Sequence, residues 1–354
     1  MPAPDRQTGG SVRWQEAVFP DERVFKAVRG GLEKALKADP RVHLIGEDIE
    51  APYGGAFKCT GDLSLAFPGR VRNTPVSEAA IVGLGTGMAL AGLRPVVEIM
   101  FGDFLSLAFD QWLNHAAKFP WMFDGQVQLP LVVRTPMGGR RGYGATHSQS
   151  IEKHFLGLPG TRVISLHQRL DPTAFYAGLL ADIDLPTLVL ENKSLYSQTA
   201  TAVVPAGFSL SQSPGLFPTV RLSPVHPPDI TLIALGGISI EAEKAAVQLL
   251  EEEIYTELLL PTSLYPLDLA PILDSLRRTG RLLVVEEGQG FVSLGAEILA
   301  QVLEGFNGRV VARRLAAAPH PIPSSRPLEQ RSLPQVEDIV ESLVELFALE
   351  SGNA

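Results

Sequence analysis

The apolar positions of this chain follow two alternating periods. Val24, Phe25, Val28, Leu32 and Leu36 recur every three to four residues, which predicts a helix over 21–38, and an apolar run at 42–45 predicts a strand after it. The same alternation continues as predicted strands at 95–100, 130–134, 162–165 and 187–191 and predicted helices at 77–91, 104–118 and 171–181. This βα rhythm is typical of an α/β domain.

The rhythm stops at 203–228, where prolines cluster at Pro205, Pro214, Pro218, Pro224, Pro227 and Pro228. It then restarts with expected strands at 230–235, 257–260, 281–285 and 310–315 and expected helices at 239–250, 269–278, 295–303 and 336–349. We therefore expect a flexible N-terminal extension (1–20), a first domain (21–202), a proline-rich linker (203–228) and a second α/β domain (229–354).

Composition narrows the class of protein. The 354 residues are 45% hydrophobic and 19% charged, as in ordinary globular proteins. The net charge of −9, with no Lys/Arg run longer than two residues, argues against nucleic acid as a partner. The lone Cys59 excludes a disulfide framework or a cysteine-based metal site. No apolar run is long enough to span a membrane and the polar N-terminus lacks a signal-peptide pattern, so the expected location is the cytoplasm.

A glycine-rich stretch, 83–87, invites comparison with a dinucleotide-binding loop. That loop must follow a strand and open a helix, whereas these glycines lie inside the predicted helix 77–91, and Met88 stands where the third glycine is needed. Gly83, Gly87 and Ala91 instead share one helix face, which suits a close contact between helices or between subunits. The sequence has no P-loop, HExxH or GxSxG motif, and Ser148 beside His147 does not make a catalytic triad.

Two polar residues stand out from the predicted core. Glu78 comes directly before the glycine-rich helix, where a carboxylate can act as a simple cap. His147 lies in a glycine-rich loop after a predicted strand, where it can be merely exposed. Loops at the carboxyl ends of parallel strands are also where ligands bind, so both residues are functional candidates.

The order of short motifs resembles the beta subunit of the thiamine-diphosphate-dependent decarboxylase component of 2-oxo acid dehydrogenases. The resemblance runs from about residue 20 to about 345, and so many blocks at matching spacing make it specific. In the first domain the blocks are Gly46–Asp48, Gly54–Phe57, Asn73–Glu78, Gly92–Glu98, Phe101–Phe104, Asp110–Gln111, Asn114–Lys118 and His147–Ser150. In the second domain they are Tyr265–Asp268, Thr279–Arg281, Val285–Gly288, Gly295–Ile298, Pro321–Pro323 and Leu328–Glu329.

The resemblance implies an α/β fold in which a transketolase-like pyrimidine-binding domain precedes a transketolase C-terminal domain. It implies that Glu78 hydrogen-bonds the aminopyrimidine of thiamine diphosphate and favours the imino tautomer that removes the thiazolium proton. Phe104 matches the aromatic residue beside that ring, and His147 the histidine that assists acyl transfer to a lipoyl group. Glu47 matches an acidic residue on the path that links the two paired active sites.

One family motif is missing from this chain. Related thiamine enzymes hold Mg²⁺ and the diphosphate with Gly-Asp-Gly and a later Asn, and neither is present at that spacing. We therefore expect no metal ligands here and an alpha subunit that holds Mg²⁺ and the diphosphate, in an α2β2 heterotetramer. The other expected partners are a 2-oxo acid substrate and a lipoyl acyltransferase core or another acyl carrier. A monovalent cation stays open, because 181–186 departs from the usual cation loop.

Three functions remain in view. The first is the beta half of a 2-oxo acid dehydrogenase, whose substrate the sequence does not select. The second is a thiamine-dependent ketol or acyl transferase that loads a carrier protein in specialised biosynthesis. The third is a non-catalytic paralogue, against which the retained Glu78 and His147 argue.

Overall fold

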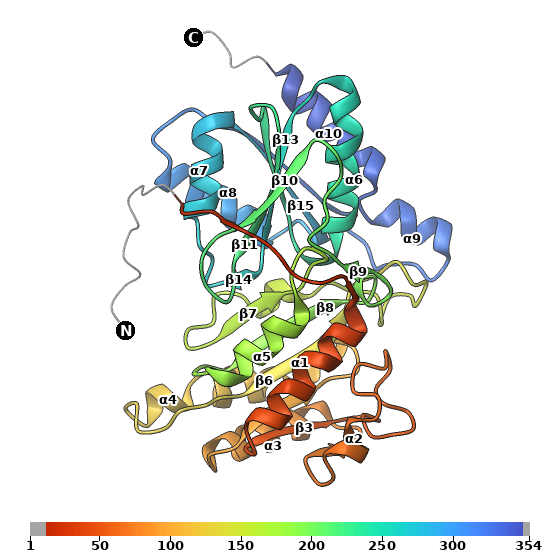
Figure 1. Ribbon diagram of the computed structural model, residues 1–354, viewed down its shortest axis with the longest axis vertical. Coiled ribbons are helices and arrows are strands. Elements are labelled where there is room, and N and C mark those ends of the chain that lie inside the picture. The colour runs from red at the N-terminus through yellow and green to blue at the C-terminus, as the bar shows by residue number, and fades with distance from the viewer. Residues whose placement is uncertain (1–11, 350–354) are drawn as a thin grey trace.

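The computed structural model describes residues 12–349. The chain forms two α/β domains, drawn one above the other in Figure 1, and each is built on a seven-stranded sheet. A short two-stranded sheet pairs β2 (Glu22–Arg23) with β9 (Thr199–Ala200). Within the described range, no helix has both the length and the apolar character needed to cross a membrane.

The first sheet carries the strands that surround the candidate site. Its order is β14-β7-β8-β6-β5-β3-β4, and every neighbouring pair except β14-β7 is parallel. The strands are β14 (Ser263–Tyr265), β7 (Arg162–Ser165), β8 (Thr187–Asn192), β6 (Val132–Met137), β5 (Arg94–Glu98), β3 (Val42–Gly46) and β4 (Val71–Asn73). Helices α1 (Val24–Ala38) and α5 (Pro172–Ala181) pack together with one buried cluster, and α3 (Glu78–Leu90) packs in the cluster of the other face.

The second sheet has the order β1-β10-β11-β13-β12-β15-β16. Its strands are β1 (Gln15–Glu16), β10 (Phe208–Gln212), β11 (Thr219–Pro224), β13 (Thr256–Pro261), β12 (Ile230–Ala234), β15 (Arg281–Gln289) and β16 (Val311–Ala317). Helices α6 (Ser239–Leu249) and α10 (Val336–Ala348) pack with one buried cluster, and α7 (Ala270–Thr279) and α8 (Leu294–Gly305) with another. The short helices are α2 (Leu63–Ala66), α4 (Phe119–Met122) and α9 (Arg326–Ser332).

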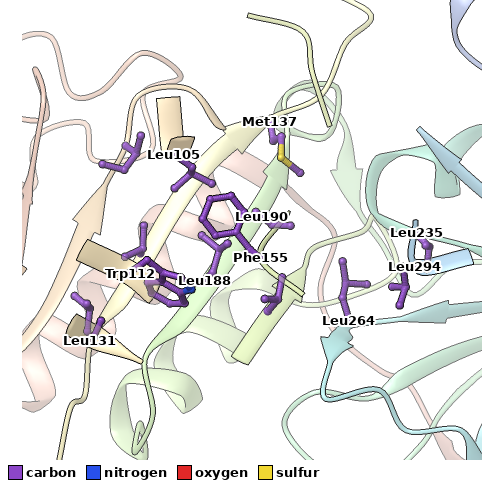
Figure 2. Packing of buried hydrophobic residues seen from close by; sticks show 14 of the residues in the cluster. Leu105, Trp112, Leu131, Met137, Phe155, Leu188, Leu190, Leu235, Leu264 and Leu294 are labelled. Carbon is purple, nitrogen blue, oxygen red and sulfur yellow. The ribbon is translucent and has the colours of Figure 1, made fainter. Parts of the chain in front are cut away.

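The two domains exchange strands and share a core. β1, from the N-terminal side, pairs with β10 of the second sheet, while β14, from the second half of the chain, pairs with β7 of the first. One buried apolar cluster spans both domains: Figure 2 shows Phe155 near Leu188 and Leu190, with Leu235, Leu264 and Leu294 on the side of the second domain. Exchange and shared burial together hold the domains in a fixed relation.

Two expectations about chain organisation need correction. The expected linker 203–228 contains β10 and β11, which pair with each other and join the second sheet. The prolines lie outside these strands, except Pro224, which ends β11. Within both strands apolar residues alternate with polar ones, as is typical of a strand. The expected flexible extension 1–20 includes β1, which is part of a sheet; its residues 1–11 lie outside the described range.

The helices differ from expectation in two details. The predicted helix 104–118 is a 3₁₀ segment (Gly102–Ala108) followed by a π-helical segment (Gln111–Ala116). In α3, the tight contact is made at Gly85, where an added Cβ would lie 2.6 Å from Val97 Cγ2. On the expected small-residue face, a Cβ at Gly83 would lie 3.3 Å from Gln111 Oε1, whereas a Cβ at Gly87 would meet nothing within 4 Å in the described chain.

The remaining 3₁₀ turns are short and connect the larger elements. They are Glu152–His154, Leu195–Ser197, Gly236–Ile238 and Leu250–Glu252.

Candidate functional site

The four candidate residues come from one edge of the first sheet. Glu47 directly follows β3, Glu78 begins α3 after β4, Phe104 follows β5, and His147 lies in the loop after β6. Strands β4, β3, β5 and β6 are neighbours and parallel, so their carboxyl ends lie at the same edge. This edge is where open α/β sheets bind their ligands.

Glu47 and Glu78 form an acidic pair at this edge. Glu47 is 5% exposed and Glu78 is 7% exposed, and the Oε1 atom of Glu47 has no hydrogen-bond partner in the described structure. Burial raises the pKa of Glu47 to about 7, and the nearby charges of Glu78, Asp48 and Glu98 act in the same direction. A carboxyl group that titrates near neutral pH can both hold and release a proton under ordinary conditions.

Glu78 does not serve as an ordinary helix cap. The N-cap residue of α3 is Ser77, whose side chain makes no capping hydrogen bond, and Glu78 occupies the first turn. Among residues 12–349 no donor reaches the carboxylate of Glu78. A buried acceptor at a helix N-terminus, free of protein donors, is suited to a ligand that brings its own N–H groups.

Phe104 and His147 belong to an aromatic group beside the acidic pair. The His147 ring packs edge-on against Phe101 and Phe104, with 5.1 Å between ring centroids in both contacts. Its Nδ1 lies 3.0 Å from Thr146 Oγ1, which leaves Nε2 without a protein partner in the described part of the chain. The ring is thus held by two aromatic neighbours while one nitrogen stays available for proton transfer.

Lys193 supports the main chain of His147. Its Nζ donates a hydrogen bond to the carbonyl oxygen of His147 and lies 5.2 Å from the centroid of the Phe101 ring. The side chain is fully buried, and this burial lowers the pKa of Lys193 to about 8. Lys193 therefore ties the end of β8 to the His147 loop.

A buried charge network beneath the edge was missed by the sequence analysis. Arg134 donates to both oxygens of Glu191, with Nε–Oε1 at 2.9 Å and Nη2–Oε2 at 2.6 Å, and its Nη1 donates to Glu98. Tyr176 and Tyr196 also donate to Glu191. Burial raises the pKa of Glu98, and Arg134 opposes that shift. The available signal was a charged residue in each of three buried strands: Glu98 in β5, Arg134 in β6 and Glu191 in β8.

Comparison with known proteins supports both halves of the fold. Residues 23–198 match the family described as "Transketolase, pyrimidine binding domain", and residues 223–339 match "Transketolase, C-terminal domain". A solved structure of a split gene transketolase, described as an inactive beta4 tetramer, aligns with a TM-score of 0.68 and 19% identity, over 96% of this chain and 99% of that chain. This structural likeness establishes the fold.

Curated relatives extend over nearly the whole chain. The pyruvate dehydrogenase E1 component subunit beta-1, mitochondrial, of Arabidopsis thaliana is 35% identical over 344 residues, covering 94% of this chain and 91% of its own. The corresponding beta subunit of Leifsonia xyli is 35% identical over 324 residues, covering 90% and 92%. The beta subunit of acetoin:2,6-dichlorophenolindophenol oxidoreductase of Bacillus subtilis is 34% identical over 341 residues, covering 91% and 96%. The chain therefore belongs to the family of beta subunits of thiamine-dependent 2-oxo acid dehydrogenases, with a transketolase-like fold.

Proposed function

We propose that this chain binds the aminopyrimidine half of thiamine diphosphate at the edge of its first sheet. The observation that carries the proposal is the buried carboxylate of Glu78, which no donor of residues 12–349 reaches, beside a second carboxyl, Glu47, whose pKa is raised to about 7. These residues fit an aminopyrimidine, which offers N–H groups to an acceptor and an aromatic face to Phe104. When bound, thiamine diphosphate supplies the electron sink for decarboxylation of a 2-oxo acid.

The two carboxylates have different proposed roles. Glu78 accepts a hydrogen bond from the ring and orients it, and Glu47 supplies or takes up the proton that the pair exchanges with its surroundings. The raised pKa of Glu47 suits this role, because a group that titrates near 7 is populated in both protonation states at neutral pH.

His147 has a separate role in the proposal. Its ring is held against Phe101 and Phe104, and Nε2 faces no protein partner in the described structure. We assign it the proton transfers that accompany acyl transfer to a lipoyl carrier. Phe104 contacts His147 and, in this proposal, also lies against the aminopyrimidine ring.

The proposed assembly completes the cofactor site. An alpha subunit would hold Mg²⁺ and the diphosphate in an α2β2 heterotetramer, because this chain lacks the Gly-Asp-Gly motif for that task. A lipoyl acyltransferase core or another acyl carrier would receive the acyl group. The proposed location is the cytoplasm, which cell fractionation tests directly; the Arabidopsis relative is named as mitochondrial.

The test is turnover in the assembled enzyme. The chain is co-purified with its alpha subunit and supplied with thiamine diphosphate and Mg²⁺, and carbon dioxide release is measured from a panel of 2-oxo acids with an artificial electron acceptor; acetoin oxidation is measured in parallel. Turnover that needs both chains supports the proposal and identifies the substrate. A cofactor-loaded complex that turns over no member of the panel would contradict it.

A matched pair of variants tests the role of Glu78. Glu78→Gln should lower turnover by about 10²–10⁴-fold, the usual size of a lost acid–base contribution, while the complex still forms. Glu337→Gln is the control, because Glu337 is an exposed glutamate in the first turn of another helix, α10. Full activity of Glu78→Gln would remove Glu78 from the mechanism.

A further inference from the structure

The loop that leads to His147 has an unusual backbone. Between β6 and His147 the chain takes left-handed conformations at Gly138 (φ 91°), Arg140 (φ 69°), Gly142 (φ 73°) and Gly144 (φ 79°). Arg140 is not a glycine, and residues with a side chain seldom adopt this backbone conformation. A loop of this kind keeps one shape only when neighbouring groups hold it there.

The holding groups come from the second domain. Glu329, in α9, accepts hydrogen bonds from the backbone N–H of Arg140 at 2.9 Å and of Gly142 at 2.8 Å, one with each carboxylate oxygen. Glu287, in β15, accepts from the backbone N–H of Gly139 at 2.6 Å and from Arg140 Nε at 3.3 Å. Each carboxylate therefore satisfies loop donors that β6 and β8 do not reach.

The loop also has little space to move away from these groups. A Cβ added at Gly138 would lie 2.3 Å from Asn192 Nδ2 and 2.6 Å from Glu287 Oε1. A Cβ added at Gly139 would lie 2.7 Å from Leu333 Cδ1 and 3.3 Å from Glu329 Oε1. The loop backbone is thus packed closely between Asn192 of β8 and the second domain.

His147 therefore lies between two sets of anchors. On its own domain, Lys193 donates to the His147 carbonyl oxygen. Five and seven residues before His147, the two oxygens of Glu329 accept hydrogen bonds from Gly142 and Arg140, and Glu329 is only 2% exposed. Charge-assisted hydrogen bonds to backbone N–H groups are short and strong, so they can fix the position of the loop that carries His147.

We propose that Glu329 and Glu287 are positioning residues for His147, through which the second domain sets the location of the active-site histidine. The inference rests on the proposed function, in which His147 assists acyl transfer. It gives the second domain a role in catalysis. The plain alternative is that both carboxylates only stabilise the contact between domains.

The first experiment needs no activity. Hydrogen–deuterium exchange is measured in the complex with the alpha subunit for the wild type and for Glu329→Gln, in which an amide NH₂ replaces one of the two acceptor oxygens. The exchange rate across 138–147 should rise by about tenfold or more, with the rest of the chain unchanged. Unchanged exchange in this loop would overturn the proposal.

The matched control is Glu257→Gln. Glu257 is a fully buried glutamate of the second sheet that pairs with Arg278 and accepts from Ser223, and it touches no residue of the loop. It imposes a comparable loss of a buried charge without loosening the His147 loop. Equal exchange in the loop of both variants would mean that general destabilisation explains the effect, which would overturn the proposal.

The second experiment is a double-mutant cycle on acyl transfer to a lipoyl domain. Glu329→Gln should lower kcat by about tenfold when His147 is present but by less than twofold in the His147→Ala background. The reason is that a positioning residue acts only through the group that it positions. Thiamine diphosphate affinity should not change. Equal loss in both backgrounds would refute the positioning role.

The outcomes also separate this inference from the proposed function. If no substrate turns over in the wild-type complex, the proposed function fails, and the exchange measurement still decides whether Glu329 holds the loop. If Glu329→Gln does not assemble, Glu287→Gln takes its place in both experiments, because it weakens the neighbouring anchor at Gly139.

Discussion

The replacement Glu47→Gln should make the stability of the folded chain depend less on pH. Burial and the neighbouring carboxylates raise the pKa of Glu47 from its ordinary 4.5 to about 7. Between pH 4.5 and 7 the folded chain therefore keeps a proton at Glu47 that the unfolded chain releases. The contribution of that proton to stability is fully present below pH 4.5 and is lost as the pH rises through 7.

The size of the effect follows from the two pKa values. One pH unit of difference corresponds to about 1.4 kcal/mol, so ionised Glu47 costs about 3 kcal/mol in the folded chain at pH 8. Glutamine is neutral throughout and avoids this cost. The free energy of unfolding of Glu47→Gln should exceed that of the wild type by about 1 kcal/mol at pH 5 and about 3 kcal/mol at pH 8.

Urea titrations followed by tryptophan fluorescence measure this difference at pH 5, 6, 7 and 8, on the chain without cofactor. Constant ionic strength keeps the screening of the neighbouring carboxylates unchanged. A difference that is constant across these pH values, or largest at pH 5, would refute the reasoning, because it would place the proton elsewhere than on Glu47.

Three further changes have defined outcomes. Arg134→Met leaves Glu98 and Glu191 buried without their cation and should lower the free energy of unfolding by about 3–5 kcal/mol. Adding Glu98→Gln and Glu191→Gln to this variant should restore most of the lost stability. Thermal melts followed by circular dichroism measure both effects. Gly85→Ala should destabilise the chain by about 1–3 kcal/mol, because its Cβ would meet Val97. Gly87→Ala has free space around its Cβ and should stabilise α3 by about 1 kcal/mol. Urea titrations measure both, and equal effects would contradict the assigned packing. Burial lowers the pKa of Lys193 to about 8, so between pH 8 and 10.5 the folded chain releases a proton that the unfolded chain keeps. The stability of the wild type should therefore rise relative to Lys193→Met over this pH range, as the midpoints of urea titrations would show.

Local patterns predicted most elements of the fold but not their exchange. The strands 162–165 and 187–191 and the helix 171–181 appear as β7, β8 and α5, because each has a clear apolar period of its own. β1 has only two residues, and β10 and β11 lie among prolines, so composition outweighed their short alternation. Their stability comes from pairing with strands far along the chain, which no local pattern encodes.

In the candidate site too, the local sequence predicted individual residues but not their contacts with distant parts of the chain. The motifs that the resemblance identified contain Glu47, Glu78, Phe104 and His147, and the parallel strands bring these residues to one edge. Glu287 and Glu329 also lie in recognised motifs, yet nothing local indicated that they would bond to a loop about 150 to 190 residues earlier. Arg134 and Glu191 form one buried pair only because β6 and β8 are neighbours.

The reciprocal placement of β1 and β14 has a consequence for any attempt to divide this protein. A fragment ending at 202 would lack β14 and expose the edge of β7, while a fragment starting at 203 would lack β1 and expose the edge of β10. Open strand edges pair readily with other copies, so each fragment made alone should aggregate. The two fragments produced together should instead complement each other, and transplanting the second half into another protein would require carrying the N-terminal strand with it.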